Sequence, residues 1–209
     1  MVYGKMDDVE KLVNPQAVLE AALEAELGRV GNQSVSLVVM EGAHYLGASA
    51  AILKSFENAK RQGIIVSVNK PVSDLREFLS KREISFDGFF FVDCITETSD
   101  RHGDSAKNVK YLESPKNLLE ISVEMEKLLR SGQNAPPFVL VDSLSTFLLY
   151  NKPEVLERFV HNLSSKMHEH KNQGVFLMIR TRENEDFIEI VSQFCDNVIE
   201  VSEKNIKTR

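Results

Sequence analysis

The sequence predicts an α/β protein of three layers, in which helices cover both faces of a mainly parallel central sheet. Two observations predict this class. First, six short apolar runs recur along the 209 residues, and they lack the alternation of apolar and polar residues that marks a half-solvated strand. Second, segments with helical spacing separate the runs, and strands that alternate with helices require crossovers within one layered sheet.

The apolar runs are the predicted strands. Because both faces of each run are apolar, we expect helices to cover both faces of the sheet. We also expect the strand at 138–141 to lie beside the strand at 35–40. The predicted strands are 35–40, 64–68, 89–95, 138–141, 175–179 and 198–201.

Five segments between these runs carry apolar residues at helical spacing. An Asn-Pro or Ser-Pro pair opens two of them, and a glycine follows most of them, with Gly63 expected as a left-handed C-cap. The polar segment 97–110 is predicted to be a loop. The predicted helices are 14 to 28 or 31, 46–62, 73–81, 114–131 with Gly132 after its last turn, and 153–171 stopped by Gly174.

Composition predicts one domain over residues 1–209, with a helical lead-in at 1–34 and a core at about 35–201. The net charge is −6 and the basic residues are dispersed, so nucleic-acid binding is not expected. No apolar run approaches the roughly 18 to 20 residues that span a bilayer, so no membrane partner is expected either. Two distant cysteines and no leader segment predict a cytoplasmic protein.

The segment GAHYLGAS, residues 42–49, follows the first predicted strand. Gly42 and Gly47 have the spacing of the phosphate-binding loop G-x-x-x-x-G-K-[ST], and Ser49 stands at the hydroxyl position that meets magnesium. Ala48 stands where that loop has its lysine, and losing the lysine removes a charged contact to the phosphates. The alternative is that the glycines only make a tight turn from strand to helix.

A second chemical signal is Asp142, which ends the strand FVLVD and is the type of carboxylate that holds a magnesium-bound water. If ATP or ADP binds, Ser49 and Asp142 are the predicted magnesium ligands; otherwise no cofactor is expected. His44 and Tyr45 could stack on a ring or could fill the space of a phosphate, and both alternatives stay open. The candidate binding residues are Gly42, Ala43, His44, Tyr45, Leu46, Gly47, Ala48, Ser49 and Asp142.

Over residues 35–201 the sequence resembles the RecA superfamily and, within it, the archaeal and bacterial proteins similar to KaiC. The more specific matches are SPKNLLEIS at 114–122 and VDSLSTFLLYN at 141–151. The resemblance implies a RecA-like P-loop NTPase fold, ATP binding at the loop, formation of oligomers, and signalling or regulatory work.

Active members of this family carry an acidic residue just past the second strand, where this chain has Asn69, Lys70 and Pro71. Because the loop lysine is also replaced, by Ala48, the resemblance implies a pseudo-ATPase: a regulatory module that binds a protein partner or forms homo- or hetero-oligomers, with no catalytic residue. The alternative is a slow ATPase whose missing groups come from Lys70, Asp74 or a neighbouring subunit.

Three further groups of residues have side chains capable of chemistry. His161, His168 and His170 lie on one predicted helix, but their spacing does not predict a metal site. Cys94 is expected to be a small buried residue. Arg180 and Arg182 follow the strand at 175–179 and are candidates for a contact with a phosphate or a neighbouring subunit, or are ordinary surface charges.

Overall fold

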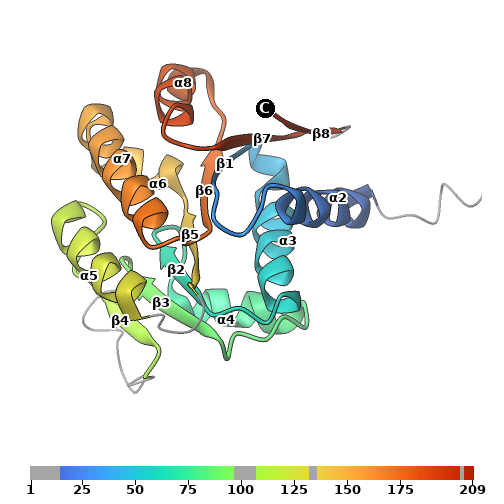
Figure 1. Ribbon diagram of the computed structural model, residues 1–209, viewed down its shortest axis with the longest axis horizontal. Coiled ribbons are helices and arrows are strands. Elements are labelled where there is room, and N and C mark those ends of the chain that lie inside the picture. Colours follow the sequence, from blue (N-terminus) through green and yellow to red (C-terminus); the bar gives the residue numbers. More distant parts are fainter. Residues whose placement is uncertain (1–14, 97–106, 132–135, 203–204) are drawn as a thin grey trace, which may run out of the picture.

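The computed structural model describes residues 15–96, 107–131, 136–202 and 205–209. In this part of the chain, eight strands form one sheet in the order β4-β3-β2-β5-β6-β1-β7-β8, in which only the β7–β8 pair is antiparallel (Figure 1). The strands are β1 Val35–Met40, β2 Gly63–Ser67, β3 Phe89–Asp93, β4 Val109–Tyr111, β5 Phe138–Asp142, β6 Gly174–Ile179, β7 Asn197–Ser202 and β8 Asn205–Thr208.

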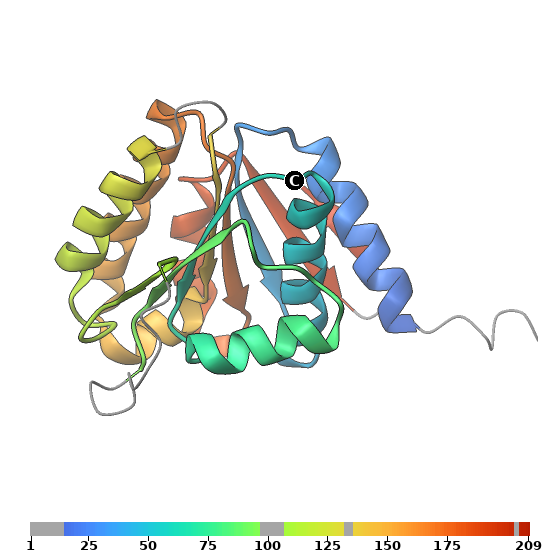
Figure 2. The same cartoon turned by 90° about the horizontal axis from the view of Figure 1, so that it is seen from below.

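Helices cover both faces of the sheet, which confirms the predicted three-layer architecture. One apolar cluster joins the sheet to α2, α3 and α4, and a second joins it to α5, α6, α7 and α8 (Figures 1 and 2). The helices are α2 Pro15–Arg29, α3 Tyr45–Asn58, α4 Val72–Lys81, α5 Leu118–Ser131, α6 Leu144–Tyr150, α7 Pro153–Glu169 and α8 Glu185–Ser192, with short 3-10 turns η1 Gly42–His44 and η3 Arg182–Asn184.

The continuous apolar runs form strands because the sheet is buried on both faces. Every residue of β1, β2 and β5 is buried. Along β1, Leu37 and Val39 pack toward one helical layer while Val38 and Met40 pack toward the other. This two-sided burial is the reason for the absence of polar residues at alternate positions.

The expectation that the strands at 138–141 and 35–40 are neighbours is wrong, because β6 lies between β5 and β1. β5 instead pairs with β2 on one side and β6 on the other. The carboxyl ends of β1 and β5 therefore lie at the same edge of the sheet but one strand apart, and only a long side chain can connect them.

The predicted role of Gly63 as a helix cap is also wrong. Helix α3 ends at Asn58, and the left-handed residue that follows is Lys60, with a φ of 51°. Gly63 is the first residue of β2, and a Cβ atom there would lie 2.1 Å from the ring of Phe138. Phe138 stacks on Phe56 with ring centroids 3.6 Å apart, so glycine is needed at 63 to leave room for this aromatic pair.

Other predicted helix ends differ by a few residues. α5 begins at Leu118, where Asn117 Oδ1 accepts a hydrogen bond from the Glu120 amide, rather than at Ser114. α7 ends at Glu169, and Gly174 already belongs to β6. The expected start at Asn14 and the glycine at 132 lie outside the described residues.

Four elements were not predicted: β4, β8, α6 and α8. β4 occupies the end of the predicted loop 97–110, whose residues 97–106 lie outside the described part of the chain. It is an edge strand of three residues, all at least partly exposed, so it carries no apolar run. α6 is a seven-residue helix, too short for a helical period to stand out from the apolar strand before it.

Candidate functional site

The carboxyl edge of the sheet brings the end of β1 close to the end of β5. After β1 the chain makes the 3-10 turn η1, in which the His44 amide donates to Glu41 O at 3.0 Å and the Tyr45 amide donates to Gly42 O. Helix α3 then begins at Tyr45, two residues before Gly47. The segment between the two glycines is therefore a closed turn followed by helix.

This geometry decides the environment of the predicted loop residues. Gly47, Ala48 and Ser49 lie within α3 and are buried, with Ala48 and Ser49 each 3% exposed. Gly42 and Ala43 are exposed in the turn, and Leu46 points to solvent with 44% of its surface exposed.

Gly42 does not need to be glycine for this turn. Its φ is not left-handed, and an added Cβ atom would lie 3.9 Å from Ile179 Cγ2, an ordinary contact. We expect Gly42→Ala to change the free energy of unfolding by no more than about 0.5 kcal/mol in urea titrations. The control is Gly31→Ala, which should cost about 1 kcal/mol because Gly31 has a φ of +89°. A large loss from Gly42→Ala would contradict the closed turn.

The central contact of the site joins Tyr45 to Asp142. The Tyr45 hydroxyl donates to the carboxylate of Asp142, 2.7 Å from Oδ1 and 2.8 Å from Oδ2. Both residues are buried, with exposures of 8% and 4%. Among the alternatives left open by the sequence, Tyr45 therefore fills space at the carboxyl edge of the sheet, while His44 stays in the turn and is partly exposed.

Burial dominates the electrostatics of this pair. It raises the pKa of the Asp142 carboxyl from its ordinary value of 3.8 to about 6, opposed by the hydrogen bond from Tyr45 and by the charge of Lys70. Burial and the neighbouring Asp142 charge raise the pKa of the Tyr45 hydroxyl well above its ordinary range. The proton of this hydrogen bond thus stays on the phenol.

Two polar side chains lie beside the pair. Ser49, one helical turn after Tyr45, has a fully buried Oγ. Ser49 and Asn69 both lie close enough to the Tyr45 hydroxyl to lower its pKa, against the larger effects of burial and Asp142. The Lys70 Nζ atom lies 5.0 Å from the centre of the Phe78 ring, where it makes a cation–π contact. Its charge also lowers the pKa of Asp142.

Asp93, at the end of β3, is a site residue for which no role was predicted. Its buried carboxylate accepts hydrogen bonds from the amides of Val72, Ile95 and Thr96 and from the Thr96 hydroxyl. It fixes the start of α4 next to Asn69 and Lys70. The signal available in the sequence was its position, an acidic residue at the end of an apolar run like Asp142.

Of the remaining candidate residues, Arg180 has partners within the chain, Cys94 is buried, and Arg182 and Asp74 are exposed. Arg180 lies 3.2 Å from both Glu185 and Glu200, so it makes contacts within the chain, while Arg182 is exposed in η3. Cys94 is buried as expected, and burial raises the pKa of its thiol. Asp74 is exposed near the start of α4.

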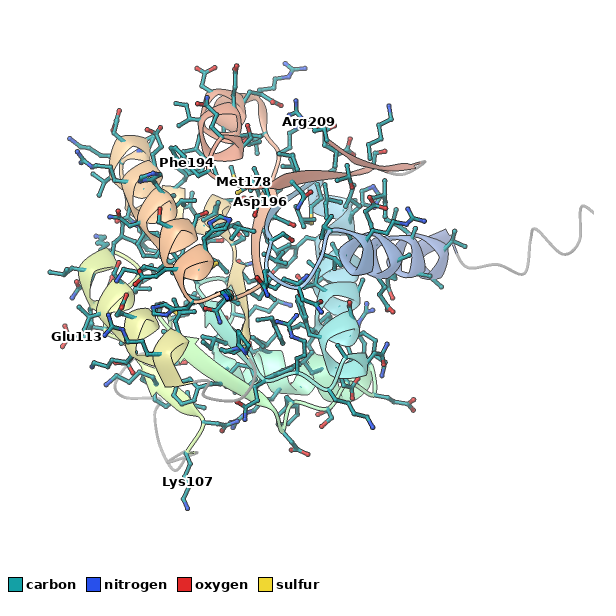
Figure 3. The ribbon with its side chains drawn as sticks, in the orientation of Figure 1. Lys107, Glu113, Met178, Phe194, Asp196 and Arg209 are labelled. Carbon is teal, nitrogen blue, oxygen red and sulfur yellow. The ribbon has the colours of Figure 1, made fainter. Side chains whose placement is uncertain are left out.

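The three histidines of the predicted helix 153–171 do not converge. His161 packs its ring against Phe194, His168 Nε2 lies 2.8 Å from Asp196 Oδ2, and His170 lies 3.7 Å from Glu126; Figure 3 labels Phe194 and Asp196, in the turn between α8 and β7. The described residues include no cluster of three histidine, cysteine or acidic side chains that could hold a metal ion.

The fold, a mainly parallel sheet with helices on both faces, is similar to the RecA-type fold of a KaiC-like protein. The structure of KaiC-like protein PH0186 from the hyperthermophilic archaeon Pyrococcus horikoshii is similar to this chain with a TM-score of 0.60 and 13% identity, over 85% of this chain and 76% of that one. The structure of protein PH0321 from Pyrococcus horikoshii, in complex with an unknown peptide, gives a TM-score of 0.64 and 15% identity, over 90% and 86%.

A family model described as a family of unknown function (DUF7504) matches residues 36–201, which is most of the chain, so the protein belongs to this family. No curated protein matches the chain. Among the residues that the structure describes, no helix is long and apolar enough to cross a membrane.

Proposed function

We propose that this protein is a KaiC-like RecA-type core that does not hydrolyse ATP and works in the cytoplasm as a regulatory, protein-binding module. The observation that carries the proposal is the hydrogen bond between Tyr45 and Asp142. It places a side chain of the protein on the carboxylate that, by resemblance to phosphate-loop proteins, would hold magnesium.

The residues at the edge of the sheet do not fit a magnesium nucleotide in this arrangement. A phosphate needs free backbone amides in an open loop and a cation beside it. Here the amides of His44 and Tyr45 are bonded within the turn, and the position of the loop lysine is the buried Ala48. Loss of phosphate binding is thus supported by backbone geometry as well as by residue type.

The lack of a base also supports the proposal. The segment after β2 carries Asn69 and Lys70, neither of which can orient an attacking water as a carboxylate does. Asp93, the nearest acidic residue at the next strand end, is fully buried and accepts four hydrogen bonds. It is therefore not available as a substitute base.

Exposed apolar side chains support binding of a protein partner or a further copy. Asn151 Nδ2 donates to Pro115 O, which holds the end of α6 against the segment before α5. Large apolar residues are exposed on α5, α6 and α7, of which α7 contacts the other two: Leu119 at 76%, Val123 at 48%, Leu149 at 80%, Tyr150 at 42% and Val155 at 40%. Exposed apolar patches are typical of interaction surfaces. The peptide bound to PH0321 is consistent with such a role.

The test measures nucleotide binding by isothermal titration calorimetry and phosphate release in the same preparation. We expect no heat of binding for magnesium ATP up to millimolar concentration and no phosphate release above a protein-free blank. Asp142→Asn should behave identically in the release assay.

The second candidate function is a slow ATPase, and one observation favours it. The charge of Lys70 acts on Asp142, so a cation is already present at the edge of the sheet. Phosphate release that falls at least tenfold in both Lys70→Met and Asp142→Asn would establish this function and overturn the first proposal.

A further inference from the structure

We infer that Tyr45 is a built-in occupant of the RecA-type ligand site: its phenol takes the place of a bound group on Asp142, so the protein closes this edge of the sheet without a ligand. This inference rests on the proposed function and deepens it. It assigns the exclusion of ligands to Tyr45, for which the sequence left open whether the ring stacks on a ligand or fills the space of a phosphate.

The phenol of Tyr45 covers the carboxylate of Asp142. The Tyr45 hydroxyl lies within hydrogen-bond distance of both carboxylate oxygens. Because Asp142 is only 4% exposed and Tyr45 only 8%, a ligand atom cannot reach the carboxylate from solvent without displacing the phenol.

The hydroxyl of Ser49 lies beside the phenol. Ser49 is one helical turn after Tyr45 on α3, and its Oγ is fully buried. It is close enough to the Tyr45 hydroxyl to lower the pKa of the phenol. The phenol therefore covers a serine hydroxyl as well as the carboxylate of Asp142.

Without the phenol, the site would offer two oxygen ligands, from Asp142 and Ser49. A carboxylate and a hydroxyl are hard oxygen ligands of the kind that bind divalent cations. Removing the Tyr45 side chain would leave Asp142 and Ser49 around a small polar cavity. Lys70 nearby would weaken the binding of a cation, so we expect an affinity in the millimolar range.

The test uses manganese ion alone as the probe, with free Mn²⁺ measured by electron paramagnetic resonance at pH 7.5. We expect Tyr45→Ala to bind Mn²⁺ at least tenfold more tightly than the wild type. The second change Asp142→Asn in the same chain should abolish the gain. The matched control is Tyr150→Ala, which removes an exposed tyrosine from α6 and should leave Mn²⁺ binding at the level of the wild type.

Circular dichroism establishes that each variant is folded. If Tyr45→Ala is unfolded, Tyr45→Leu replaces it, since leucine keeps much of the apolar volume and lacks the phenol oxygen; the same gain is expected. Wild-type protein that binds Mn²⁺ as tightly as the variant would overturn the inference. A folded variant without the gain would overturn it as well.

Failure of this inference can be distinguished from failure of the proposed function. Binding of magnesium ATP by the wild type would overturn the proposed function. If neither ATP nor Mn²⁺ binds the wild type and folded Tyr45 variants also fail to bind Mn²⁺, the non-hydrolysing role stands and Tyr45 is only a packing residue.

Discussion

Replacing Tyr45 by phenylalanine should lower the free energy of unfolding by about 2 to 3 kcal/mol at pH 7.5. The change keeps the buried ring and removes only the hydroxyl, so the loss measures the hydrogen bond to Asp142. Hydrogen bonds to charged groups contribute more than neutral ones, and removing the donor leaves a buried carboxylate without its partner. Urea unfolding followed by circular dichroism gives the value.

The control is a double-mutant cycle with Asp142→Asn. The asparagine side chain can still accept from the phenol but carries no charge, so Tyr45→Phe should cost only about 1 kcal/mol in that background. Equal losses in the two backgrounds would show that the phenol does not interact with the charge of Asp142.

The stability of the protein should also depend on the ionisation of Asp142. Burial raises the pKa of this carboxyl to about 6 from 3.8, so between these values the folded state binds more protons than the unfolded state. The contribution of Asp142 is therefore most favourable below about pH 4 and is lost as the pH rises to about 6. The linked change amounts to about 3 kcal/mol.

This pH dependence is isolated by comparing Asp142→Asn with the wild type at pH 4 and pH 7.5. The pKa of Glu126 is lowered to about 2 by Lys166 and Arg130, so that residue destabilises the protein as the pH falls, with the opposite sign. It is present in both proteins and cancels in the difference. We expect Asp142→Asn to gain about 3 kcal/mol relative to the wild type between the two pH values. A difference that does not change with pH would mean that Asp142 is not buried as an ionisable group.

The sequence was a good guide to the central strands and a poor one to the edges. β1, β2 and β5 are buried on both faces, so their apolar runs carry the signal of a strand without reference to neighbours. β4 and β8 lie at the two edges of the sheet. Their short segments pair on one side only and contain charged residues, which the same criterion cannot detect.

The site could be predicted in its position but not in its conformation. Residues 42–49 were correctly expected to follow the strand that ends at Met40, and Asp142 was correctly expected to end the strand Phe138–Asp142. The sequence left open whether Gly42 and Gly47 form a phosphate-binding loop or a tight turn from strand to helix. The structure has the turn η1, and α3 begins at Tyr45, one residue before the predicted start. The contact that accompanies this conformation joins residues 97 positions apart, and local spacing carries no information on such a contact.

Gly63 is a second residue whose role depends on a contact with a distant part of the chain and could not be predicted from local spacing. Gly63 follows a helix at a distance that predicts a cap. In the structure, the absence of a side chain at Gly63 leaves room for the ring of Phe138, which lies far along the chain. Glycine is informative about close approach as well as about left-handed backbone, and the sequence does not separate the two.

The measurement that tests closure of the site by Tyr45 most directly is a thermal unfolding scan of the wild-type protein with and without millimolar magnesium ATP, repeated with ADP. A ligand that binds only the folded state raises its stability by RT ln(1 + [L]/Kd). We predict no change in the midpoint with either nucleotide, because Tyr45 already holds Asp142. An upward shift of several degrees, lost in Asp142→Asn, would contradict the closed site and identify residues 42–49 as a working nucleotide-binding loop.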